Sequence, residues 1–184
     1  FTARAIFYRE TKKFDHFQVG IAIPVQKMVE SVSSGIMFTI DPVTNSKTTI
    51  VIEAIYGLGE MIVQGMVTPD HYEVDKKSLT VTAKTIKTQE KKMLRKQHEN
   101  VIVQLSQLLG SKQKISDEAI LEIAKIGKNL EKHYYFPQDI EWAIDASKTI
   151  YIVQTRPVTT MGKELSAVSS ETSAGRVKKI ERKL

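Results

Sequence analysis

Residues 139–157 constrain the fold of this chain more than any other stretch, because they read as two β-strands joined by a tight turn. Their sequence is D-I-E-W-A-I-D-A-S-K-T-I-Y-I-V-Q-T-R-P. β-branched and aromatic residues favour strands, and the polar run from 145 to 148 favours a turn. Alternation along the first strand places Ile140, Trp142 and Ile144 on one face and sends Asp139 and Glu141 to the other. The stretch therefore predicts a β-hairpin with one apolar and one acidic side.

The returning strand adds polar residues to the acidic side. Alternation groups Ile152, Gln154 and Arg156 on one face, and a two-residue turn pairs Glu141 with Ile152 and Asp139 with Gln154. A shift of this register by two residues leaves the two acids, the amide and the guanidinium on one patch. Carboxylate and amide oxygens suit Mg²⁺, and a guanidinium suits a phosphate. An exposed strand face whose Asp–Arg pair serves only solubility explains the spacing as well, so both readings stay open.

Other stretches predict a mainly antiparallel sheet with a long helix packed on it, an α+β fold. Strands are predicted at 20–30, 33–42 and 48–56, where short turns favour antiparallel neighbours. Residues 70–75 and 79–88 predict a hairpin in a peripheral sheet. The helix is predicted at 116–133, with Ser116 at its N-cap and the apolar stripe Ile120, Ile123, Ala124 and Leu130. Helix-spaced apolar residues also occur between 1 and 14, whereas 89–114 leaves a short helix or an extended chain open.

The segment Gly57-Leu-Gly-Glu60 follows a predicted strand and precedes a predicted short helix. Backbone N–H groups in such a setting can approach an anion. The segment matches neither the Walker A pattern nor the dinucleotide-binding fingerprint. A tight glycine turn with a solvent-facing Glu60 is the competing interpretation.

Composition limits the function classes. The chain has 184 residues, 41% of them hydrophobic and 26% charged, which is typical of a globular protein. It has no cysteine, which excludes disulfides and thiol catalysis. No signal peptide or membrane-spanning run is visible, so we expect a cytoplasmic location and no membrane partner. The net charge is +6, but the basic runs at 84–96 and 176–183 are not interleaved with aromatic residues, so nucleic acid is not an expected partner.

Several motifs, in order, resemble the nucleotide-binding domain shared by phosphoenolpyruvate synthases and pyruvate phosphate dikinases. They are V-Q-K-M-V at 25–29, S-G-I-M-F-T-I-D-P at 34–42, G-L-G-E at 57–60, D-I-E-W-A at 139–143 and I-V-Q-T-R-P at 152–157. The resemblance covers about residues 1–160 and implies the C-terminal half of an ATP-grasp domain. Residues 161–184 read as a linker and a stub toward a phosphohistidine swivelling domain, whose opening strand resembles 173–180.

The resemblance also implies roles for individual residues. Gln26 and Met28 would contact the nucleotide base. Glu141 and Gln154 would hold Mg²⁺ and the nucleotide phosphates, with Asp139 supporting the metal. Glu60 and Arg156 would act on the phosphates.

The implied activity is that of a phosphoenolpyruvate synthase, a pyruvate, water dikinase of pyruvate metabolism and gluconeogenesis. ATP would transfer its β,γ-diphosphate to a carrier histidine and on to pyruvate, giving phosphoenolpyruvate, AMP and phosphate. None of the four histidines lies in the family's carrier motif, so we expect no synthase activity from this chain alone. The expected partners are ATP, an N-terminal ATP-binding half and a swivelling domain. The alternatives are pyruvate phosphate dikinase, a dikinase acting on rifampicin or glucan, and a non-catalytic nucleotide-binding module.

Overall fold

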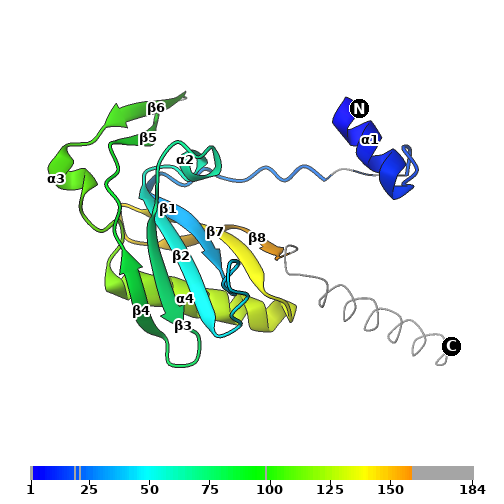
Figure 1. The fold of residues 1–184 in the computed structure, drawn as a ribbon. Coiled ribbons are helices and arrows are strands. Elements are labelled where there is room, and N and C mark those ends of the chain that lie inside the picture. Colours follow the sequence, from blue (N-terminus) through cyan, green and yellow to red (C-terminus); the bar gives the residue numbers. More distant parts are fainter. Residues whose placement is uncertain (1, 19, 21, 98, 159–184) are drawn as a thin grey trace.

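A six-stranded antiparallel sheet organises the chain in the computed structural model, which describes residues 2–18, 20, 22–97 and 99–158 (Figure 1). The strands stand in the order β4-β3-β2-β1-β7-β8. Their bounds are β1 Ser31–Phe38, β2 Thr49–Tyr56, β3 Asp70–Asp75, β4 Thr80–Thr85, β7 Gln138–Asp145 and β8 Ile150–Pro157. The predicted α+β class and the antiparallel hairpin at 139–157 are therefore confirmed. The predicted linker and stub at 161–184 lie outside the described residues.

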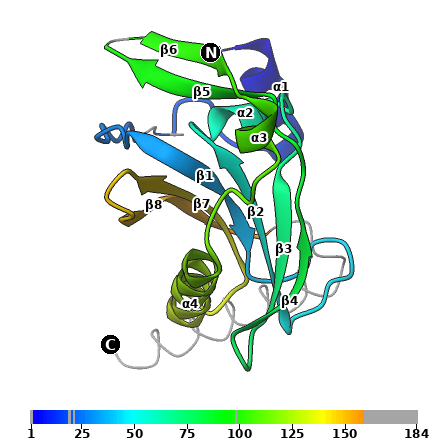
Figure 2. The same ribbon diagram turned by 90° about the vertical axis from the view of Figure 1, so that its left-hand side faces the viewer.

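Helix α4 (Asp117–Tyr134) covers one face of the sheet (Figure 2). The Ser116 side chain caps it by accepting a hydrogen bond from the Ala119 N–H at 3.3 Å, as predicted. Its apolar stripe packs against the inward side chains of β1, β2, β3 and β7, which include Met37, Ile52, Tyr72, Ile140 and Trp142. Burial of this continuous apolar layer is the main force that holds the helix to the sheet.

The other face of the sheet is covered only in part. Helix α2 (Glu60–Val63) and the hairpin of β5 (Lys91–Lys96) and β6 (Glu99–Gln104) pack there around Ile55, Leu58, Met61 and Met93. The one-turn helix α3 (Gln107–Gly110) follows the hairpin. The stretch left open by the sequence is thus extended at 91–96 and at 99–104, with a single helical turn after it. These four packed residues cover only part of this face, and the part next to α2 stays uncovered.

Two strand predictions are wrong. Residues 22–30 are extended but form no regular strand, because their backbone joins no ladder and Pro24 has no N–H to donate. Residues 70–75 are not peripheral: β3 lies inside the main sheet between β2 and β4, and the side chains of Tyr72 and Val74 are fully buried. The polar residues that alternate with them, His71 and Glu73, face away from α4, so the strand looks half-exposed in the sequence.

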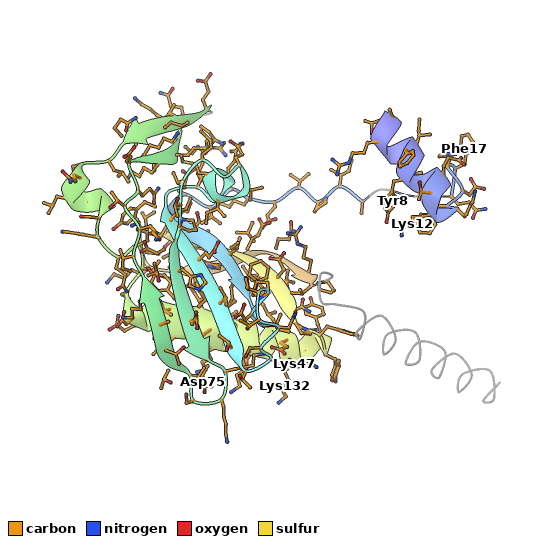
Figure 3. All side chains as sticks on the ribbon, in the orientation of Figure 1. Tyr8, Lys12, Phe17, Lys47, Asp75 and Lys132 are labelled. Atoms are coloured by element: carbon orange, nitrogen blue, oxygen red, sulfur yellow. The ribbon has the colours of Figure 1, made fainter. Side chains whose placement is uncertain are left out.

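Helix α1 (Ala3–Lys12) has no buried residue, and in Figure 1 it lies apart from the sheet. Figure 3 places Lys47, Asp75 and Lys132 at the end of the sheet opposite α2. There Lys76 Nζ lies 2.8 Å from Glu131 Oε2 and ties the β3–β4 turn to α4. Among the described helices, none has the length and apolar character needed to cross a membrane.

Candidate functional site

The hairpin of β7 and β8 brings the predicted polar patch together. Glu141 pairs with Gln154, and Asp139 pairs with Arg156, so that all four side chains lie on the face away from α4. The predicted pairing of Glu141 with Ile152 is wrong by two residues. The chain turns over residues 146–149 rather than over two residues, and the Asp145 side chain accepts N–H bonds from Ser147 and Thr149 at 2.9 and 3.0 Å.

A β-bulge in β8 explains why the patch forms. Glu141 pairs with Gln154 but the next residue, Trp142, pairs with Ile152, so Val153 is an extra residue in the ladder. Ile152 therefore packs toward the core under α4, whereas Gln154 faces the opposite side. The prediction that Ile152, Gln154 and Arg156 share one face is wrong for this reason.

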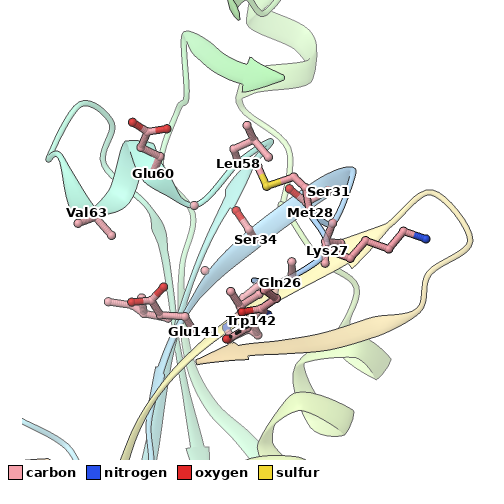
Figure 4. A pocket seen from close by; sticks show the side chains of 16 residues that line it. Gln26, Lys27, Met28, Ser31, Ser34, Leu58, Glu60, Val63, Glu141 and Trp142 are labelled. Carbon is pink, nitrogen blue, oxygen red and sulfur yellow. Dashed lines mark hydrogen bonds between the residues drawn. The ribbon is translucent and has the colours of Figure 1, made fainter. Parts of the chain in front are cut away.

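A pocket of about 400 Å³ opens on this face, between β1, β7, α2 and the extended segment 26–29 (Figure 4). Four of the predicted site residues line it: Gln26, Met28, Glu60 and Glu141. In Figure 4 the carboxylates of Glu60 and Glu141 both lie on the left of the pocket, with Met28 and Leu58 to their right. The Lys27 ammonium points outward. The pocket thus has an acidic side and an apolar side.

The loop that carries Glu60 is fixed by two serines of β1. Ser31 Oγ and Ser34 Oγ both donate to the Gly57 carbonyl oxygen, at 3.1 and 2.6 Å. Gly57 has φ of +86°, and a Cβ there would meet the Met93 carbonyl oxygen at 2.3 Å. Only glycine tolerates this conformation at such a close approach. The loop therefore enters α2 in one position, which places Glu60 at the pocket.

Arg156 and Asp139 form an ion pair beside the pocket. Arg156 Nε donates to Asp139 Oδ2 at 2.8 Å, and the Arg156 side chain is 60% exposed against 13% for Asp139. The hydrogen bond to Asp139 raises the pKa of Arg156 above its ordinary value. Neither residue lines the pocket itself. The guanidinium thus lies next to the acidic side, oriented by a carboxylate.

The opposite wall rests on the bulge. Gln26 Nε2 donates to the Val153 carbonyl oxygen at 3.3 Å, at the extra residue of β8. This bond holds the segment containing Met28 against the hairpin. The predicted contact residues Gln26 and Met28 are therefore brought to the same cavity as Glu60 and Glu141, although the segment is not a strand.

The donor set fits a divalent cation that keeps part of its coordination for other ligands. The acidic side offers the carboxylates of Glu141 and Glu60. The Gln154 amide does not line the pocket itself but lies directly across the ladder from Glu141. Among the described residues, no three His, Asp or Glu side chains converge as a complete protein cage. Mg²⁺ is commonly held by one or two carboxylates together with phosphate oxygens and water, which is the arrangement this side allows.

Sequence reasoning missed several residues that shape the site. Ser31 and Ser34 precede Gly35 in a run of small residues, and only the fold shows that both hydroxyls reach Gly57. Asn100 lies within 89–114, where the sequence does not decide between a helix and an extended chain, yet its Nδ2 is 3.3 Å from Glu60 Oε2. No pattern in the sequence points to these contacts, because each joins elements far apart in the chain.

Comparison with known proteins agrees with this geometry. The family model described as pyruvate phosphate dikinase, AMP/ATP-binding domain, matches residues 1–176. A phosphoenolpyruvate synthase of Pyrococcus furiosus is 46% identical over 178 residues, which cover 92% of this chain and 22% of the relative. A probable phosphoenolpyruvate synthase of Methanocaldococcus jannaschii is 46% identical over 164 residues, 89% of this chain and 14% of the relative.

A second group of relatives carries a different name. A rifampicin phosphotransferase of Bacillus cereus is 40% identical over 164 residues, which cover 88% of this chain and 18% of the relative. The chain thus spans only about a fifth of the length of these relatives.

Proposed function

Because this chain belongs to the pyruvate phosphate dikinase AMP/ATP-binding family, we propose that it binds Mg-ATP as part of a longer dikinase of the phosphoenolpyruvate synthase type. In that enzyme the β,γ-diphosphate of ATP passes to a carrier histidine outside this chain and a phosphoryl group passes on to pyruvate, with AMP and phosphate as products. The sheet, α4 and α2 are proposed to be the C-terminal half of an ATP-grasp domain.

The observation that carries the proposal is the two-sided pocket. Carboxylates of Glu60 and Glu141 lie at one side of the cavity and the apolar side chains of Met28 and Leu58 at the other. A magnesium nucleotide has the same division, with charged phosphates and cation at one end and a flat base at the other. A cavity of about 400 Å³ lies within the range typical of small-molecule sites, about 300–1,000 Å³.

Each side chain of the site has a role in the proposed binding of Mg-ATP. Glu141 and Gln154 hold the cation that bridges the phosphates, with Glu60 and Asp139 supporting the cation or its water. Arg156 stabilises negative charge on the transferred group, and Gln26 and Met28 lie along the base. Phosphoryl transfer depends mainly on holding charge in place, so a site built from such groups needs no covalent step of its own.

A fluorescence titration tests the proposal directly. Trp142 is the only tryptophan of the sequence, is 1% exposed and lines the pocket. Titration of the chain with ATP in Mg²⁺ should give a saturable change in emission that is lost with EDTA. A Trp142→Phe variant, which lacks the reporter, is the control for inner-filter effects. An unchanged emission in Mg²⁺, together with no binding by calorimetry when the N-terminal ATP-binding half is also supplied, would contradict the proposal and favour a module that binds no nucleotide.

The similarity to rifampicin phosphotransferases supports a second candidate for the final acceptor. Relatives of both names align with this chain at 40–46% identity, so the nucleotide half of the reaction is common to them. Turnover assays on the full-length protein with pyruvate and with rifampicin as acceptors separate the two. Formation of phosphoenolpyruvate and AMP supports the synthase, and phosphorylation of rifampicin alone supports the second candidate.

A further inference from the structure

We propose that the β5–β6 hairpin holds the acidic side of the pocket in place, and that Asn100 of this hairpin is a positioning residue for Glu60. The inference rests on the proposed function, since it assigns a partner to a carboxylate of the proposed Mg-ATP site. The hairpin lies in the stretch for which the sequence predicts neither structure nor role.

The register of the hairpin places the two side chains together. Arg95 on β5 pairs with Asn100 on β6, and paired residues of antiparallel strands project to the same face. Asn100 Nδ2 donates to Glu60 Oε2 at 3.3 Å. Arg95 Nε lies 3.9 Å from Glu30 Oε1, directly after the segment that forms the opposite wall. One pair of the hairpin thus contacts Glu60 in the pocket and, at a longer distance, Glu30 beside the pocket.

Strand β5 is bonded to the loop that precedes α2, and this fixes the position of the hairpin relative to Glu60. Met93 forms a parallel bridge with Gly57, and its carbonyl oxygen accepts the Leu58 N–H at 2.9 Å. The Met93 side chain is 7% exposed and packs with Leu58 and Met61. The loop that carries Glu60 is therefore held by the hairpin through the backbone and, at Asn100, through a side chain.

The chemistry of the contact suits a metal-supporting carboxylate. Glu60 Oε1 accepts from Gln64 Nε2 at 2.7 Å, so each carboxylate oxygen has one amide donor. A carboxylate has about four lone-pair sites, which leaves acceptor capacity for a cation or its water. An amide orients the carboxylate without cancelling its charge, whereas a lysine in this place would compete with the cation.

The test compares three variants of the chain by Trp142 fluorescence. Asn100→Ala removes the donor, Asn100→Asp puts a second carboxylate beside Glu60, and Gln104→Ala removes an amide from the same strand at the far end of the hairpin. We expect Asn100→Ala to weaken binding of Mg-ATP by about three- to tenfold, and Asn100→Asp to weaken it further. Gln104→Ala should match the wild type within about twofold.

The readout that separates positioning from general damage is adenosine, which has the base but no phosphates. Its affinity should stay unchanged in the Asn100 variants, because Glu60 acts only on the phosphate side. In a Glu60→Gln background, Asn100→Ala should have no further effect on Mg-ATP binding. Equal losses for adenosine and Mg-ATP, full additivity, or wild-type affinity in Asn100→Ala would each overturn the inference. If the wild-type chain binds no Mg-ATP even with the N-terminal ATP-binding half supplied, the proposed function falls as well, so the two failures are distinguishable.

Discussion

Arg156 donates to Asp139 at 2.8 Å, so the cation proposed to act on the phosphates is already paired with a carboxylate of the same patch. The pair crosses from β8 to β7 two residues along the ladder from Glu141 and Gln154, on the same face. Under the proposed function, Asp139 would therefore serve first to orient the guanidinium, and its support of the metal would be indirect.

This pairing predicts that changes at the two positions are not additive. Asp139→Asn and Arg156→Gln should each weaken Mg-ATP binding, but the double variant should lose less binding free energy than the sum of the two single losses, by a coupling energy of about 0.5 kcal/mol. The coupling is small because the Arg156 side chain is largely exposed to solvent. Titration of Mg-ATP into the four proteins measures it, and strict additivity would show that the two side chains act separately.

Glu141→Gln should remove most of the magnesium dependence of nucleotide binding. The change keeps the shape of the side chain but removes the charge that faces the pocket, so we expect Mg-ATP affinity to fall by at least about tenfold. Glu73→Gln is the matched control, because Glu73 lies on the same sheet face but outside the pocket. Circular dichroism should be unchanged in both variants. Magnesium-dependent binding of wild-type strength in Glu141→Gln would remove this residue from the site.

The sequence predicts the local geometry of the site better than its assembly. The acidic and amide residues of 139–157 could be placed on one patch because alternation is a local property of a strand. The bulge at Val153 could not be predicted, since nothing in I-Y-I-V-Q-T marks the extra residue. The longer turn and the bulge each shift the pairing by one residue, so the predicted register is wrong by two at Glu141, although the predicted patch is right.

The features that could not be predicted from the sequence depend on contacts between residues far apart in the chain. The capped helix α4 follows from local signals, namely Ser116 and the apolar spacing. The buried place of β3 depends on helix α4, which lies more than 40 residues further along the chain and packs on Tyr72 and Val74. The extended form of 22–30 depends on the absence of a partner strand. The meeting of Glu60 with Asn100 depends on a hairpin whose residues, K-K-M-L-R-K and E-N-V-I-V-Q, alternate too weakly to predict strands.

Gly57→Ala should destabilise the loop that carries Glu60, and Gly59→Ala should not. A Cβ at Gly57 would lie 2.3 Å from a backbone oxygen at a φ of +86°, whereas at Gly59 the nearest atom, Ser34 Oγ, is 3.4 Å away. We expect Gly57→Ala to lower the free energy of unfolding by at least about 2 kcal/mol. For Gly59→Ala we expect a loss below about 1 kcal/mol. Urea denaturation measures both, and equal losses would contradict the proposed role of the Gly57 conformation.

The buried ion pair of Lys114 and Asp70 predicts a large stability effect away from the pocket. Both side chains are 0% exposed, with Nζ 3.0 Å from Oδ1. Lys114→Met leaves the Asp70 carboxylate buried without its cation, which should cost about 3–5 kcal/mol. Lys112→Met is the control, because that neighbouring side chain is exposed and its loss should change stability by less than about 0.5 kcal/mol. Urea denaturation curves that coincide for the two variants would be inconsistent with a structural pair.

The turn of the β7–β8 hairpin predicts a pH effect. A hydrogen bond from the Ser147 side chain is the main cause that lowers the pKa of Asp145 below its ordinary value of 3.8. The folded state therefore holds this proton less tightly than the unfolded state, and the resulting stabilisation is complete above about pH 4 and lost as pH falls below 3.8 through the lowered folded value. The melting temperature of wild type should exceed that of Asp145→Asn at pH 6, and the difference should shrink at pH 3. A difference that is the same at both pH values would exclude this carboxylate as the source.

The single extra residue at Val153 also makes the length of β8 a functional constraint. If β8 paired regularly at its present length, Val153 would lie opposite Glu141 and Gln154 opposite Ile140, which would drive the amide and the guanidinium into the hydrocarbon layer beneath α4. Deletion of Val153 would instead leave Gln154 opposite Glu141 and Arg156 opposite Asp139. A homologue aligned with a gap at this position would consequently keep both groups on the pocket side but would lack the carbonyl oxygen that accepts from Gln26.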